Sequence, residues 1–247
     1  MNLLLLFETI KFHKVKQESA VRILFIFCFL SNIVSYIIPG SDSDLSALFD
    51  AYQALTEGRF VTPQITQGNW IFIGGSFAAA LITLLCVYTY AALFAGEREN
   101  RSTREIMAGL FRALPALAGF GLLLIVPSIL SAFLLMIPLL ILLAALYFLP
   151  LNLILGRQKI TDALAATVRD TSHMKMIIFL QYMMLIIIVN FPETLLATVL
   201  PVAGLPAALI AAFFITAKAM MRGRLMGIFY LTLVKKVPVV IPSKPNV

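Results

Sequence analysis

The chain alternates long uncharged stretches with short polar segments. The stretches cover residues 23–39, 70–96, 113–156, 176–191 and 194–217. About 20 apolar residues are enough for a helix to cross the hydrocarbon core of a bilayer. The third stretch, as one helix rising 1.5 Å per residue, would reach about 66 Å, roughly twice that thickness. It is therefore predicted to hold two spans, with a turn at 135–139, because Pro138 lacks the backbone N–H that a continuing helix needs.

This pattern predicts an all-α fold: a polytopic, multi-pass membrane helix bundle of about six spans. The six predicted spans form a single membrane domain, residues 1–236, which a short tail, residues 237–247, follows. The spans are predicted at 21–39, 70–95, 113–135, 139–156, 176–192 and 203–221.

The basic residues predict the orientation. Of the 19 lysines and arginines, all but Arg59 fall in segments that six spans would place on one side. Arg59 lies in the loop 40–68, which also carries four acidic residues. Lysine and arginine in short loops stay on the cytoplasmic side. Both termini, the 237–247 tail included, are therefore predicted to be cytoplasmic, and 40–68 to be external.

Three cytoplasmic segments, 7–19, 97–112 and 159–172, are predicted to form amphipathic helices that lead into outgoing spans. Together they suggest a three-fold pseudo-repeat at about 1–95, 97–156 and 157–234. Such helices are expected to lie at the inner interface and attract anionic lipid headgroups. The alternative is a collar that docks another protein. The candidate contact residues in either case are Arg101, Arg104 and Arg112.

One candidate ion or substrate site lies near the fifth span. Glu193 follows Asn190 and Pro192 in a long apolar region, and a charge in the hydrocarbon costs about 2.5–3.5 kcal/mol on insertion scales. Pro192 is expected to break the helix, and a broken helix that carries a carboxylate is typical of transporters. The alternative is a span that ends at Phe191, with Glu193 in external water.

Lys218 and Arg222 lie one helical turn apart near the inner end of the last span. Their long side chains are expected to extend to the cytoplasmic headgroups. The alternative is a cationic pocket for lipid phosphate. Gly223 and Gly227 form a small-xxx-small pair that lets helices approach closely. Asn152, next to Pro150, is expected to bond to freed backbone or to a neighbouring helix.

The remaining residue types predict no catalytic residues, no metal and no cofactor. The sequence has no HExxH, no paired Cys-x-x-Cys and no Walker loop. Cys28 and Cys86 fall in apolar stretches and are expected to be buried thiols. The net charge of +7 comes without a long basic run, so nucleic acid is not expected as a partner and the charge is assigned to topology.

Part of the chain resembles a known family. The residues that carry the likeness are Ile-Pro-Leu-Leu-Ile at 137–141, Pro150, Leu-Ile-Leu-Gly-Arg at 153–157 and the amphipathic 161–171. They resemble the YciC-like family of uncharacterised bacterial inner-membrane proteins, which is related to the membrane domain of some glycerophosphodiester phosphodiesterases. The likeness covers about 97–180. Leu139 departs from the family's usual glycine, and 161–171 is less basic. The resemblance implies six helices and residence in the bacterial inner membrane.

These observations predict a non-enzymatic scaffold or accessory subunit of a membrane process that contacts lipid. The expected partners are the bilayer itself and either anionic lipid headgroups or another membrane protein. The alternative function is a small secondary transporter or permease with an ion or proton site near Glu193. A lipid-processing enzyme has support only from the family's relation to a phosphodiesterase.

Overall fold

The computed structural model describes residues 3–132, 137–199 and 204–237. Within these ranges the chain is helical and contains no strand. The helices are α1 (Leu3–Ile10), α2 (Glu18–Ile37), α3 (Ser46–Thr56), α4 (Gln67–Arg98), α5 (Thr103–Ala132), α6 (Ile137–Ala145), α7 (Leu149–Ile154), α8 (Ile160–Thr171), α9 (Lys175–Val199), α10 (Leu205–Phe229) and the π-helix η1 (Tyr230–Val234). The prediction of an all-α membrane protein is confirmed at this level, because four helices, α4, α5, α9 and α10, are long and apolar enough to cross a membrane.

Three boundaries differ from the sequence prediction. Residues 7–19 do not form one helix, since α1 ends at Ile10 and α2 begins at Glu18. The predicted span 139–156 is split into α6 and α7, because Pro150 has no N–H to continue the hydrogen-bond ladder and instead opens α7. The segment 97–112 is shared between two helices, with Arg98 ending α4 and Thr103 beginning α5. The predicted turn at 135–139 falls partly on 133–136, outside the described residues.

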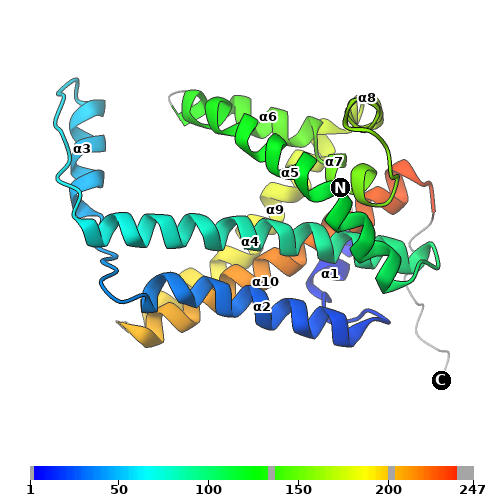
Figure 1. Ribbon diagram of the computed structural model, residues 1–247, viewed down its shortest axis with the longest axis horizontal. Coiled ribbons are helices and arrows are strands. Elements are labelled where there is room, and N and C mark those ends of the chain that lie inside the picture. Colours follow the sequence, from blue (N-terminus) through cyan, green and yellow to red (C-terminus); the bar gives the residue numbers. More distant parts are fainter. Residues whose placement is uncertain (1–2, 133–136, 200–203, 238–247) are drawn as a thin grey trace.

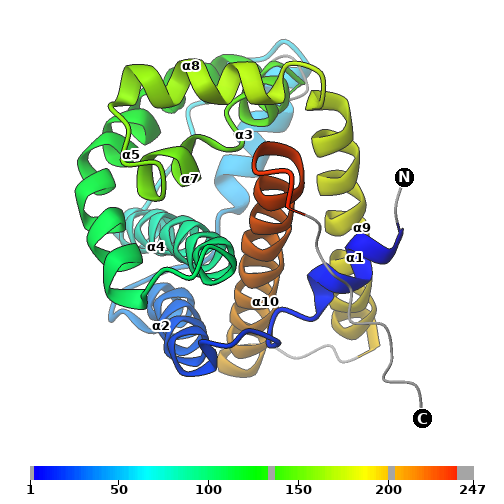
Figure 2. The same ribbon diagram turned by 90° about the vertical axis from the view of Figure 1, so that its right-hand side faces the viewer.

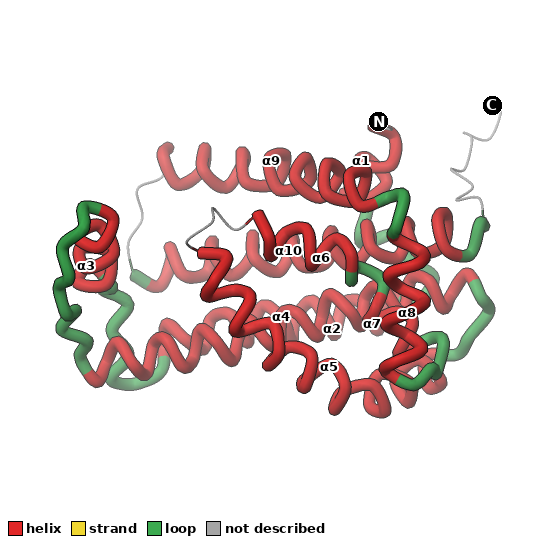
Figure 3. The backbone as a smooth tube through the Cα atoms, turned by 90° about the horizontal axis from the view of Figure 1, so that it is seen from above, coloured by secondary structure: helices red, strands yellow, loops and turns green. Residues whose placement is uncertain are grey.

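α2, α4 and α10 pack against one another and form the centre of the bundle. Figure 1 shows these three running along the long axis, and Figure 2, viewed from one end, shows α5, α7 and α8 on one side of them and α9 on the other. α6 packs against both α5 and α9, which closes a ring around a space beside α4 and α10. Figure 3 shows α1 and the short helices α7 and α8 gathered toward one end, and α3 alone at the opposite end.

Close packing of α4 on α10 depends on two glycines. A Cβ on Gly223 would lie 2.7 Å from the Val87 carbonyl oxygen, and one on Gly227 would lie 2.7 Å from Cδ1 of Phe94. Only glycine allows the two helices to approach this closely. The predicted small-xxx-small pair is therefore a contact between two helices that are apolar enough to span a membrane.

At the end of the bundle where α3 lies, a polar cap at the start of α4 holds the loop before α3 in place. The Thr66 side chain accepts a bond from the Asn69 N–H, which caps the helix. The Asn69 side chain also donates to the carbonyl oxygens of Asp42 and Asp44, at 3.1 and 2.7 Å. The Ser46 N–H donates to the Asp44 carboxylate at 3.0 Å and holds the pKa of that carboxyl below its ordinary value. The cap thus ties the loop before α3 to the start of α4.

The predicted amphipathic helix at 159–172 is present as α8. Its buried face carries Ala163, Thr167 and Thr171. Asn152 on α7 donates to the Thr167 hydroxyl at 2.9 Å, which confirms its expected bond to a neighbouring helix. Ile160, Leu164 and Val168 recur at helical spacing on the same apolar side, but they are exposed. Only part of that side is therefore covered by protein.

Candidate functional site

A cavity of about 520 Å³ lies between the central helices and the ring formed by α5, α6 and α9. Its walls are mostly apolar, with Leu84, Phe120 and Ile215 among them. On α4 the lining runs from Ser76 to Tyr88, which at 1.5 Å per residue is about 18 Å of helix. The volume falls within the roughly 300–1,000 Å³ typical of ligand sites. The space is thus elongated, apolar and large enough for one ligand.

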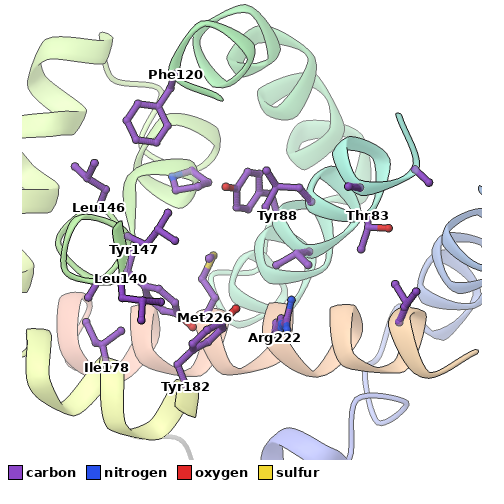
Figure 4. Close-up of a pocket in the computed structure, with 18 of the residues that line it drawn as sticks. Thr83, Tyr88, Phe120, Leu140, Leu146, Tyr147, Ile178, Tyr182, Arg222 and Met226 are labelled. Carbon is purple, nitrogen blue, oxygen red and sulfur yellow. The ribbon is translucent and has the colours of Figure 1, made fainter. Parts of the chain in front are cut away.

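Arg222 provides the positive charge of this cavity. No other charged residue is found among the described residues that line it. α10 begins at Leu205, and Arg222 lies 17 positions further on, about 26 Å from the start of the helix. Its guanidinium carbon lies 5.4 Å from the ring centre of Tyr182, a distance at which a cation is attracted to the ring face. Figure 4 shows both side chains at one wall of the cavity.

Three tyrosines surround the region near Arg222. Tyr88 comes from α4, Tyr147 from the turn between α6 and α7, and Tyr182 from α9. Figure 4 shows all three rings on the walls of the same space. Among the described residues, none makes a hydrogen bond to the Tyr147 hydroxyl, although this oxygen is buried. A buried hydroxyl normally has a partner, so Tyr147 is an unsatisfied polar group in the wall of the cavity.

Other cations inside the fold have carboxylate partners, in contrast to Arg222. Arg101 pairs with Glu99 at 2.8 Å, Arg224 lies 3.6 Å from Glu8, and Lys218 pairs with Glu193. In the part of the chain that the structure describes, no carboxylate lies within 4 Å of the Arg222 guanidinium. Because removing a charge even partly from water is costly without a partner, this difference makes the half-buried Arg222 the most distinctive group of the cavity.

The structure brings the predicted residues Asn190, Glu193 and Lys218 together. The Lys218 ammonium donates to the Asn190 side-chain oxygen at 3.1 Å and to the Glu193 carboxylate. Lys218 was expected to extend to the cytoplasmic headgroups, whereas in the structure its ammonium is held by Asn190 and Glu193 on α9. A carboxylate within reach on α9 compensates the ammonium directly, so Lys218 is turned toward α9.

The expected helix break at Pro192 is absent. α9 continues through Pro192 to Val199, so the helix does not end at Phe191 and Thr194 belongs to it. Proline costs one backbone hydrogen bond, but apolar helices tolerate it when neighbouring groups satisfy the freed carbonyl. The transporter alternative therefore loses the broken helix on which it depended, and Glu193 is instead part of an ion pair between helices.

The three predicted contact arginines do not form one surface. Arg101 is half-buried, and its guanidinium donates to the Leu155 carbonyl oxygen at 2.6 Å. Glu99, which pairs with Arg101, also lies 3.2 Å from the Lys235 ammonium. Arg104 and Arg112 are exposed on α5. Arg101 therefore joins α4, α7 and η1 at the end of the bundle, whereas only Arg104 and Arg112 are available to lipid or to a partner.

The burial of Arg224 was not predicted from the sequence. This residue is only 5% exposed, and its guanidinium donates to the Lys14 carbonyl oxygen at 2.9 Å and lies 4.8 Å from the ring centre of Phe94. Nearby, the Tyr90 hydroxyl donates to the Phe12 carbonyl oxygen at 2.5 Å. These contacts fasten the α1–α2 connection to α4 and α10. The available signal was its position between Gly223 and Gly227, on the face that packs closely.

Groups that could hold a metal ion are not clustered in the part of the chain that the structure describes. No set of three or more His, Cys, Asp or Glu side chains that could hold a metal occurs among the described residues. Cys28 and Cys86 are buried free thiols, and Cys28 Sγ lies 3.7 Å from the Thr83 hydroxyl. No protein-family model matches the chain, and neither a curated protein nor a solved structure was found to be similar to it.

Proposed function

We propose that this chain is a non-enzymatic, six-span protein of the bacterial inner membrane, an accessory subunit or scaffold whose role depends on holding a lipid. The observation that carries this proposal is the cavity beside α4 and α10. Its apolar walls suit a hydrocarbon chain, while its polar groups are one arginine, one asparagine amide and several hydroxyls. Among the described lining residues there is no carboxylate or histidine to act as a general base. The site therefore favours binding over catalysis.

Six spans follow if α2 and the α6–α7 pair are added to the four long apolar helices. α2 has 20 residues and packs against α4 and α10 along the bundle. α6 and α7 together contain an apolar segment, Leu139–Ile154, and pack against α5. An even number of spans places both termini on one side, and the distribution of lysine and arginine assigns that side to the cytoplasm. The resemblance of 97–180 to the YciC-like family supports the same location.

A reporter at each end of the bundle tests this topology. A fusion after Lys236 and a cysteine at position 112, in place of Arg112, are expected to report from the cytoplasm. A cysteine at position 59, in place of Arg59, is expected to be labelled from outside the cell by a thiol reagent that does not cross membranes. Because Cys28 and Cys86 are buried, the unmodified chain provides the background. External labelling at position 112, or a periplasmic signal after Lys236, would contradict the topology.

Reducing the cavity volume tests the lipid-holding role. Ala80 lines the cavity and is exposed to it, so Ala80→Phe is expected to displace a bound chain without disturbing a packed contact. Ala78 is also exposed on α4 but does not line the cavity, and Ala78→Phe is the matched control. Lipid retained by the purified protein, counted by native mass spectrometry, is expected to fall at least ten-fold in Ala80→Phe alone. Equal retention in both variants, or none in the unmodified protein, would contradict the proposal.

A further inference from the structure

We propose that the cavity binds a single-chain amphipathic acid, with its anionic headgroup against Arg222 and its acyl chain along the α4 wall. This inference rests on the proposed function and specifies its ligand. The shared chemistry is an acidic group on one hydrocarbon chain, which a phosphate or a carboxylate can supply. Two features carry it: a guanidinium that no carboxylate of a described residue compensates, and an apolar space that continues away from it.

The charge balance of the cavity calls for an anion. Arg222 is half-buried on a helix long enough to cross a membrane, and its described partner is the face of the Tyr182 ring. A cation–π contact compensates only part of the lost hydration of a guanidinium. A bound acid would supply the missing charge, and the planar fork of arginine matches the two oxygens of a carboxylate or phosphate.

The hydrogen-bonding groups around Arg222 favour an acceptor. Tyr88 and Tyr147 each carry a hydroxyl that can donate to an anionic oxygen. The Tyr147 hydroxyl is buried and makes no hydrogen bond to a described residue. Since an arginine has donors and no acceptor, a ligand rich in acceptor oxygens would satisfy Arg222. A cationic or neutral headgroup would leave the arginine uncompensated.

The shape of the cavity favours a chain over a compact solute. From Tyr88 the lining of α4 continues through Leu84 and Ala80 to Ser76, a distance of about 18 Å along the helix. Figure 4 shows Tyr88 and Thr83 at successive positions along this wall, with Arg222 on the facing helix. An acyl chain that enters beside Arg222 can follow this wall and bury its methylenes against apolar side chains.

Three probes that share one acyl chain separate the contributions of head and tail. Lysophosphatidate carries a phosphate, a fatty acid carries a carboxylate, and a monoacylglycerol carries no charge. The unmodified protein in neutral detergent is expected to retain both acids at least ten-fold better than the monoacylglycerol. A preference between lysophosphatidate and the fatty acid identifies which acid the site takes.

Arg222→Gln is expected to remove that ten-fold preference and to leave monoacylglycerol retention unchanged, whereas Arg222→Lys keeps part of it. Arg112→Gln, at an exposed arginine of α5 outside the cavity, is the matched control and is expected to behave as the unmodified protein. Equal retention of the three probes, or an unchanged preference in Arg222→Gln, would overturn this inference while leaving lipid binding intact. If no probe is retained by the unmodified protein, the proposed function fails as well.

Discussion

Glu8→Ala is expected to lower the stability of the protein by about 3 kcal/mol, which is typical for removing one partner of a buried ion pair. The Glu8 carboxylate lies 3.6 Å from the Arg224 guanidinium and 2.5 Å from the Lys11 ammonium, and its side chain is 11% exposed. Without it, Arg224 keeps its burial between α1, α4 and α10 but loses its nearby anion. For a chain of this size, we expect the melting temperature in detergent to fall by roughly 6–12 °C.

The exposed pair of Glu18 and Arg22 provides the matched control. Its atoms lie 2.6 Å apart, but the two side chains are 58% and 72% exposed, so water already solvates both charges. Glu18→Ala is therefore expected to change stability by less than about 1 kcal/mol. Hydrogen exchange should also show faster exchange of α1 in Glu8→Ala. Equal melting temperatures for the two variants would show that the Glu8–Arg224 contact contributes nothing specific.

Gly109→Ala is the second substitution for which a large effect is expected. A Cβ at this position would lie 2.4 Å from the Ile154 carbonyl oxygen on α7, and a backbone atom cannot move aside as a side chain can. Relieving the clash requires α5 and α7 to separate, at an expected cost of about 1–3 kcal/mol. α7 also provides Asn152, which holds α8, so the loss should loosen both helices. Thermal unfolding in detergent measures the change.

Gly121, on the same helix, provides a control for which the opposite change in stability is expected. No atom lies within 4 Å of a Cβ built there, and alanine is a better helix former than glycine by about 1 kcal/mol. Gly121→Ala is therefore expected to leave the melting temperature unchanged or to raise it, while Gly109→Ala lowers it. If both variants shift in the same direction by the same amount, helix propensity and not the α5–α7 contact determines the result.

The helices whose own residues are apolar could be predicted from local composition. The uncharged stretches predicted α4, α9 and α10, because the ability of a helix to cross a bilayer depends on the apolarity of its own residues. The helical spacing of apolar residues predicted a helix at 159–172, and each end of α8 lies within one residue of that prediction. The interruption at 146–148 could also have been found, since Pro150 cannot continue a helix from the preceding turn.

Contacts between side chains that are far apart in the chain were not predicted from the sequence. Lys218 meets Glu193, 25 positions away, and Arg224 lies close to Glu8, 216 positions away in the chain. The spacing of Lys218 and Arg222 by one turn suggested a joint cationic pocket, but only Arg222 lines the cavity. A charged residue in an apolar helix needs a partner that compensates its charge. The residues next to it in the sequence do not indicate where that partner lies.

By itself the sequence determined that the chain is a set of apolar helices and where its charges concentrate, because both depend on residues that are neighbours in the chain. The tertiary structure alone decided that Arg222 faces a cavity with no carboxylate among its described lining residues, while Lys218 and Arg224 lie close to carboxylates. The direction in which each side chain points is set by which helices pack together, and that packing is a property of the whole bundle.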